Sequence, residues 1–259
     1  MSLADTSYGF IWYADHALAS SSHLKNRAAL LLIHGAGGTH LDWPLQLRRL
    51  PEAYVAACHL PGHGYSPGPP RTTIASYAED VVALLGALNI EQAYIVGHSM
   101  GGAVALTLAL NEPERVKGLI LISTGAKLRV HADILEHVVD DTEGVVTLVN
   151  GWEWSADADP DLRAAGYERR LAAGAETLYA DYTACDTFDV RERLPEINVP
   201  TLVLGGTDDR MTPFKYSHYL AQNIPEAQLD IIEGGSHMMA LEQPQVIVKS
   251  IQRWLKKVN

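Results

Sequence analysis

The stretch that decides the fold is "AYIVGHSMGGAVALTLAL", residues 93–110. An apolar run of β type leads into Ser99, which lies between Gly97 and Gly101 in a G-x-S-x-G pattern, and a second apolar run follows at once. A serine on a tight turn from strand to helix takes a strained backbone, and flanking side chains would collide with the neighbouring elements. Glycine-flanked serines also mark ordinary turns. In this setting the pattern predicts a strand, a bend that exposes the Ser99 hydroxyl, and a helix whose N-terminal dipole faces developing negative charge.

Other apolar runs repeat the pattern of residues 93–98, and each ends at glycine or a polar residue. They cover residues 9–17, 29–34, 53–60, 118–123, 201–206 and 228–235. Runs that are apolar throughout, rather than alternating, belong in a parallel sheet covered on both faces. Helical patterns fall between them, at residues 76–88, 101–110, 213–224 and 244–258. Alternating strands and helices predict one doubly wound α/β sheet with right-handed crossovers.

One segment breaks this alternation. Residues 126–193 contain no strong strand pattern, only helical fragments rich in Ala, Asp, Glu and aromatic residues. The segment lies between two predicted strands, which favours a helical cap inserted over the sheet, although an ordinary stack of surface helices is the alternative. We therefore expect an α/β core formed by 1–125 and 194–259, and a helical cap over 126–193.

Composition and charge exclude several classes of partner. The chain has 259 residues, 47% of them hydrophobic, and a formal net charge of −11 without a cluster of basic residues. This argues against nucleic acid and anionic membranes as partners. No signal peptide is evident, and the longest apolar run is too short to span a bilayer. We expect a cytoplasmic protein with no integral membrane association. Cys58 and Cys185 show no metal spacing, and we expect two free thiols, a disulfide being the alternative.

Several polar residues stand directly after predicted strands, where open parallel sheets place their ligands. They are His34, His63, Ser99, Asp208, Asp209 and His237. A serine hydroxyl needs a base within hydrogen-bond reach, and His237 follows the last strand in a glycine-rich loop. The base needs an acid that fixes its tautomer, and Asp208 and Asp209 both follow the preceding strand. The order Ser, Asp, His along the chain is the order expected of one particular fold.

Four motifs in order carry a resemblance to the α/β-hydrolase superfamily over nearly the whole chain. They are "HGAGG" (34–38), "PGHGYS" (61–66), "GHSMGG" (97–102), and "GTDDRMTP" (206–213) paired with "GGSHMMALEQP" (234–244). The resemblance implies an α/β-hydrolase fold, a mostly parallel doubly wound sheet with an inserted helical cap. In that superfamily the acid commonly falls three residues after a glycine and four before a proline, which selects Asp209. Asp208 would then cap the following helix or be solvated.

The same resemblance implies the residues that surround the reaction. The backbone N–H groups of Ala36 and Met100 would form the oxyanion hole, which meets the charge on a tetrahedral intermediate. We expect substrate contacts from Gly35, Trp43 and Met238, with packing as an equally good interpretation of Trp43. The cap aromatics Trp152 and Trp154 contact an apolar part of the substrate or form the core of the cap.

These residues predict a serine hydrolase that cleaves a small or medium carboxylic ester through an acyl-enzyme intermediate. The catalytic residues would be Ser99, Asp209 and His237, and the substrate a small molecule with an apolar acyl or alcohol part, with no cofactor or metal. Thioesters, lactones and the C–C bonds of β-diketone-like compounds are alternatives for the same residues. A ligand-binding receptor without catalysis is the alternative of another class, because a fold does not guarantee chemistry. The sequence does not predict the oligomeric state.

Overall fold

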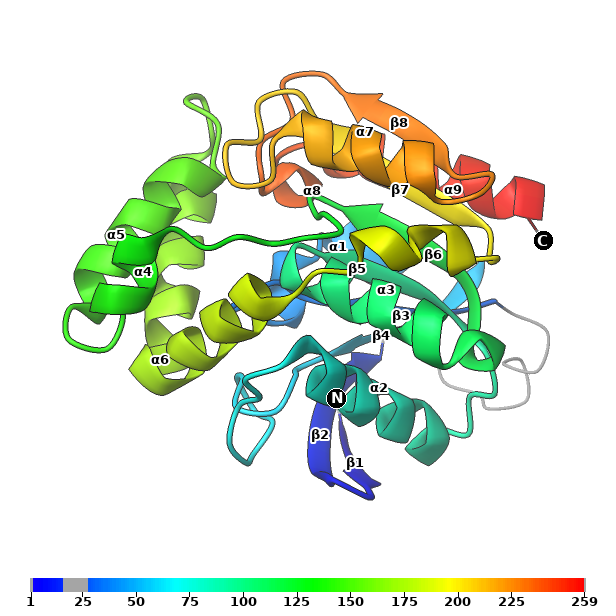
Figure 1. Cartoon of the computed structure of the whole chain (residues 1–259), viewed down its shortest axis with the longest axis horizontal. Coiled ribbons are helices and arrows are strands. Elements are labelled where there is room, and N and C mark those ends of the chain that lie inside the picture. Colours follow the sequence, from blue (N-terminus) through cyan, green and yellow to red (C-terminus); the bar gives the residue numbers. More distant parts are fainter. Residues whose placement is uncertain (1, 16–27, 259) are drawn as a thin grey trace.

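The computed structural model describes residues 2–15 and 28–258, and Figure 1 shows a single sheet flanked by helices. The eight strands of the sheet run in the order β1-β2-β4-β3-β5-β6-β7-β8. Their bounds are Ser2–Thr6 (β1), Gly9–Asp15 (β2), Ala28–Ile33 (β3), Ala53–Cys58 (β4), Ala93–His98 (β5), Val116–Ile122 (β6), Thr201–Gly206 (β7) and Gln228–Ile232 (β8). The pairs β1–β2 and β2–β4 are antiparallel, and all the others are parallel. The prediction of a mostly parallel sheet is confirmed.

Helices cover both faces of this sheet. Their bounds are Leu45–Arg48 (α1), Ile74–Ala87 (α2), Met100–Asn111 (α3), Ala132–His137 (α4), Thr142–Glu153 (α5), Pro160–Thr187 (α6), Phe214–Asn223 (α7), Met239–Glu242 (α8) and Pro244–Val258 (α9). The strand residues alternate between two apolar clusters. One cluster joins one face of the sheet to α2, α3 and α7, and the other joins the opposite face to α1 and α9. Strands buried on both faces explain why their sequences are apolar throughout.

The helices α4, α5 and α6 lie between β6 and β7 in the chain and to one side of the sheet (Figure 1). They enclose an apolar cluster of their own, which includes Ile134, Val146 and Leu178. Within residues 126–193 the only β pairing is an isolated bridge between Lys127 and Asp189, where the chain leaves the sheet and returns. The helical character of this segment agrees with the sequence, while its division into a core and a cap stays a prediction.

A few local details differ from the sequence-based expectations. The strand β1 was not expected, because it is a short edge strand with an alternating pattern, in which Ala4 is buried and Leu3 is exposed. Pro213 lies just before α7 as its N-cap rather than inside the first turn. The polar stretch "SSSHLKNR" (20–27), which follows the first apolar run and is expected to form a loop, falls outside the described residues, as do residues 16 and 17 of that run. Among the helices described, none combines the length and the apolar character that crossing a bilayer would require.

Candidate active site

The bend at Ser99 joins β5 to α3. Ser99 has a φ of 52° and a ψ of −117°, a left-handed conformation that a non-glycine residue adopts only at a cost of about 1–3 kcal/mol. A Cβ atom at Gly97 would overlap the carbonyl of Gly101, and one at Gly101 would overlap the carbonyl of Ile33 on β3. The Thr124 hydroxyl donates a hydrogen bond of 2.7 Å to the Ser99 carbonyl. The glycines therefore allow the close packing that holds the serine in this conformation.

A hydrogen-bonded pair of Asp209 and His237 lies at the ends of β7 and β8. The Nδ1 atom of His237 is 3.0 and 3.1 Å from the two carboxylate oxygens of Asp209, and both side chains are buried. An ionised carboxylate only accepts hydrogen bonds, so Nδ1 carries a proton and Nε2 of the neutral ring is free to act as a base. Burial opposes the charged ring, but the Asp209 carboxylate outweighs it and raises the pKa of His237 above 6.5.

Asp209 is held in place by its own loop. It accepts hydrogen bonds from the backbone N–H groups of Met211 and Thr212, both 2.9 Å, and from the Thr212 hydroxyl at 2.8 Å. Burial alone would raise the pKa of this carboxyl, yet His237 and these donors lower it to about 2. The neighbouring Asp208 is exposed and accepts a hydrogen bond from the Thr207 hydroxyl. Of the two candidate acids, Asp209 is thus the one that contacts the histidine.

His98, the residue before Ser99, packs beside His237. Its Nε2 atom donates to the His237 carbonyl at 3.0 Å, and the two ring centroids lie 4.8 Å apart. Burial and the neighbouring His237 lower the pKa of His98 to about 4, so this ring is neutral near pH 7. The bend at Ser99 and the loop of His237 are therefore joined directly through one neutral imidazole.

The glycine-rich loop after β3 faces the same place. Gly35 and Ala36 line one cavity together with Ser99 and His237. His34 braces this loop, because its Nδ1 donates to the Gly35 carbonyl at 2.8 Å while its Nε2 accepts from the backbone N–H of Leu60.

Met100, the other expected oxyanion donor, is the first residue of α3 and fully buried. Its backbone follows Ser99 directly, at the N-terminus of the helix. The dipole of α3 therefore points toward the serine bend.

A residue that no sequence pattern indicated, Asp181 of α6, binds the Gly35–Gly38 loop from the other side. Its fully buried carboxylate accepts hydrogen bonds from the Gly37 N–H (2.7 Å), the Tyr77 hydroxyl (2.6 Å) and Nε2 of His63 (2.7 Å). The other ring nitrogen of His63 lies 3.1 Å from the Pro61 carbonyl. Both nitrogens thus face acceptors, which requires a protonated ring. Burial opposes this charge, but Asp181 outweighs it and raises the pKa of His63.

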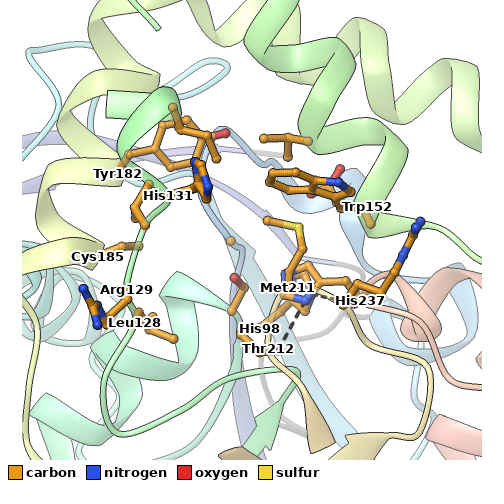
Figure 2. A pocket seen from close by; sticks show the side chains of 18 of the residues that line it. His98, Leu128, Arg129, His131, Trp152, Tyr182, Cys185, Met211, Thr212 and His237 are labelled. Carbon is orange, nitrogen blue, oxygen red and sulfur yellow. Dashed lines mark hydrogen bonds between the residues drawn. The ribbon is translucent and has the colours of Figure 1, made fainter. Parts of the chain in front are cut away.

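The cavity above Ser99 has a volume of about 600 Å³. Figure 2 shows Trp152 and Tyr182, from α5 and α6, on facing walls, with His98, Thr212 and His237 below them. Trp152 therefore faces the cavity, whereas Trp154 is buried and packs against Gly166 of α6.

Two expected substrate contacts lie elsewhere in the described part of the chain. Trp43 does not line the cavity but is buried in the core, with its ring edge-on to His98 at 6.3 Å between centroids. Met238 is also absent from the lining, and its N–H donates to the Glu153 carbonyl. In the sequence Trp43 follows the glycine-rich loop and Met238 follows His237. Both side chains are nevertheless buried in the protein interior.

Cys58 and Cys185 are both buried and free, as expected. Among residues 2–15 and 28–258, no group of three or more His, Cys, Asp or Glu side chains is arranged to hold a metal ion. The groups that line the cavity do include the Ser99 hydroxyl and the His237 imidazole, which is paired with the Asp209 carboxylate.

Comparisons with known proteins relate the chain to hydrolases. The chain is 28% identical over 248 residues to 3-oxoadipate enol-lactonase 1 of Acinetobacter baylyi, covering 91% of each chain. It is 30% identical over 253 residues to the putative carbamate hydrolase RutD of Serratia proteamaculans, covering 89% of this chain and 91% of that one. The structure of a thermophilic esterase superimposes with a TM-score of 0.85 at 30% identity, covering 100% of this chain and 98% of the other. The model of the alpha/beta hydrolase family matches residues 30–250, so this chain belongs to that family.

Proposed function

We propose that this protein is a serine hydrolase that cleaves small or medium carboxylic esters, including cyclic esters, through an acyl-enzyme intermediate. The observation that carries the proposal is the joint placement of three groups. Ser99 on its strained bend and His237, hydrogen-bonded to Asp209, face one cavity of about 600 Å³. That volume lies in the range of small-molecule sites, roughly 300–1,000 Å³.

The mechanism assigns one role to each group. Nε2 of His237 takes the proton of the Ser99 hydroxyl as its oxygen attacks the acyl carbonyl. The backbone N–H groups of Ala36 and Met100 donate to the oxyanion, where one such donor is typically worth about 3 kcal/mol. His237 then returns the proton to the departing alcohol, and a water molecule, activated by the same ring, releases the acid. Asp209 keeps the imidazole in the required tautomer and stabilises its charged form.

Helices α4, α5 and α6 act in this proposal as a cap that selects the substrate. Trp152 and Tyr182 come from these helices, whereas Ser99 and His237 lie in the connections that follow β5 and β8. Residues that choose the substrate are thus separated in the chain from residues that perform the reaction. This separation is consistent with relatives that are named for different substrates, an enol-lactonase and a putative carbamate hydrolase.

Lactones are the best second candidate. A lactone is a cyclic ester, so the same groups open it, and the alcohol stays attached to the acyl chain instead of leaving. The resemblance to an enol-lactonase over 91% of both chains favours including lactones in any substrate panel.

The test compares the wild-type protein with Ser99→Ala on p-nitrophenyl acetate, p-nitrophenyl butyrate and a simple γ- or δ-lactone. We expect Ser99→Ala to lose most of the activity, by a factor of about 10³ or more. Ser123→Ala is the matched control, because Ser123 also has a positive φ at the end of a neighbouring strand but does not line the cavity. Equal activity of wild type and Ser99→Ala on every substrate would refute the hydrolase and favour a non-catalytic ligand-binding protein.

A further inference from the structure

The lining of the cavity carries a charge opposite to that of the whole protein. The chain has a formal net charge of −11, yet the described residues that line the cavity include three arginines, Arg129, Arg170 and Arg210, and a single acid, Glu153. Arg129 and Arg210 are exposed and follow the neighbouring strands β6 and β7, and Arg210 donates to the Gly151 carbonyl of α5. A positive cleft in a negative protein attracts anions locally and raises their encounter rate. The pattern therefore suggests an anionic ligand.

Two buried polar groups in the same lining have no partner within the described chain. Arg170 and Tyr182 both belong to α6, and each is more than nine-tenths buried. The Nη atoms of Arg170 contact Glu153 at 2.7 Å, but its Nε–H donates to no described group, and the hydroxyl of Tyr182 is likewise unpaired. Burying an unpaired donor is energetically costly, so native proteins rarely retain one without a reason. Both atoms are closed to solvent in this structure, so a ligand accepts from them only when the two side chains shift toward the cavity that both residues line.

This wall lies close to the proposed reaction centre. A Cβ atom at Gly37, the residue after Ala36, would stand 3.3 Å from Cγ of Arg170. Figure 2 shows Tyr182 on the same side of the cavity as His131 and Arg129, opposite Trp152. A ligand that reaches both Ser99 and this wall is therefore a small molecule with a reactive group at one end and an acceptor group at the other.

We propose that Arg170 and Tyr182 form a subsite for a carboxylate of the substrate, and that the preferred substrates are esters or lactones that also carry a carboxylate group. The inference rests on the proposed hydrolase function. The carboxylate accepts from the Nε–H of Arg170 and the hydroxyl of Tyr182, while Glu153 keeps its contact with the Nη atoms. Arg129 and Arg210 supply the positive charge that offsets Glu153 and guides the anion into the cavity. A neutral carbonyl also accepts from these donors but gains nothing from the two exposed arginines.

The test uses monomethyl adipate and methyl hexanoate, two methyl esters of equal chain length that differ in a terminal carboxylate. Hydrolysis is followed by proton release at constant pH. We expect the wild-type kcat/KM to be about tenfold or more higher for monomethyl adipate, the effect of a hydrogen bond to a charged group. Tyr182→Phe and Arg170→Lys should each lower this ratio by about tenfold. Tyr179→Phe, on an exposed residue of the same helix, is the matched control and should leave the ratio unchanged.

Folding defects are separated from this effect by thermal unfolding. The Tyr182 hydroxyl has no partner among the described residues, so Tyr182→Phe should not lower the Tm. Arg170→Lys retains a positive charge beside Glu153 while removing the Nε–H. A loss of selectivity at unchanged Tm in Tyr182→Phe is a result that a purely structural role would not produce.

The role of the two exposed arginines is tested by varying the salt concentration. We expect kcat/KM for monomethyl adipate, but not for methyl hexanoate, to fall with ionic strength, because screening weakens long-range attraction. The double variant Arg129→Gln/Arg210→Gln should lose this salt dependence. Arg163→Gln is the matched control, since Arg163 is exposed on α6 but does not line the cavity.

Failure of the subsite and failure of the hydrolase give different results. Turnover of methyl hexanoate at the same or a higher kcat/KM, or an equal loss on both esters in Tyr182→Phe, would overturn the carboxylate subsite and leave the hydrolase intact. Where neither ester is cleaved, calorimetry with Ser99→Ala decides: monomethyl adipate should bind about tenfold more tightly than methyl hexanoate, and Tyr182→Phe should remove the difference. Equal binding of the two would overturn the proposal.

Discussion

Replacing Asp181 by asparagine tests whether the buried network around the glycine-rich loop supports the fold and the site. The carboxylate accepts hydrogen bonds from Gly37, Tyr77 and His63, and the His63 ring is its charged partner. Asparagine keeps the shape but removes the charge and turns one acceptor into an NH₂ group, which then faces a donor. Breaking a buried pair in this way typically costs about 3–5 kcal/mol. For a chain of this size we expect a fall in Tm of about 10 °C.

The contact between Asp181 and His63 also predicts how the free energy of unfolding changes with pH. Asp181 raises the pKa of His63 above 6.5, so the contribution of His63 to the free energy of unfolding is complete below pH 6.5 and is lost as pH rises through the folded-state pKa. In Asp181→Asn, burial without the carboxylate lowers that pKa instead. The free energy of unfolding of the variant should therefore lack the decrease at alkaline pH that His63 causes in the wild type. Urea unfolding at several values between pH 6 and pH 9 measures both slopes.

The same variant should be slower as an enzyme, because the Gly37 N–H lies next to the proposed oxyanion donor of Ala36. A loop that shifts by a fraction of an ångström misplaces the donor, and we expect kcat on p-nitrophenyl butyrate to fall about tenfold or more. Asp208→Asn is the matched control: its carboxylate is exposed, and its unfolding free energy should stay within about 0.5 kcal/mol of wild type. Stability of Asp181→Asn within about 1 kcal/mol of wild type, with an unchanged pH slope, would refute the reasoning.

Three further predictions follow from the site. Because His237 acts when neutral and its pKa is raised, kcat/KM should fall about tenfold per pH unit below a midpoint above 6.5, and a flat profile from pH 5 to 8 would contradict the proposal. Thr212→Val removes the hydroxyl that donates to Asp209 and should lower kcat about tenfold in the same ester assay, with wild-type kcat counting against this role. Gly101→Ala should lower the Tm by more than about 10 °C or abolish folding, whereas Gly86→Ala, in open space on α2, should raise stability by about 0.5–1 kcal/mol; equal melting curves would show that the bend tolerates a side chain.

The parts of the molecule that follow from sequence are those governed by local rules. The sheet was predictable because strands buried on both faces need apolar runs, and the Ser99 bend because only glycine fits beside it. His237 and Asp209 were predictable because both stand where a strand ends, and the structure brings their side chains together. Their catalytic role, with Ser99, remains a proposal that the ester assay decides.

Asp181, Arg170 and Glu153 could not be predicted, because each depends on a contact across many residues of chain. Asp181 lies inside a helix of the least patterned segment, and its partners Gly37 and His63 come from loops far away in the sequence. Trp43 shows the reverse case: its position near the glycine-rich loop suggested a substrate contact, but the direction of its side chain is set by the core. Position along the chain predicts which loops meet, while the direction of a side chain depends on packing.

These long-range contacts also bear on how a substrate reaches Ser99. The segment 126–193 is joined to the glycine-rich loop after β3 and to the loop of His237. Asp181 accepts from the Gly37 N–H, and the Glu153 carbonyl accepts from the Met238 N–H. Lifting the whole segment would break a buried ion pair at a cost of about 3–5 kcal/mol, so the lifted form would be sparsely populated. Arg129 and Arg210 line the cavity with exposed side chains, and Arg210 also joins this segment to the sheet, because it donates to the Gly151 carbonyl of α5. Two cations at the cavity favour the same anionic substrates that the unpaired donors of Arg170 and Tyr182 would hold.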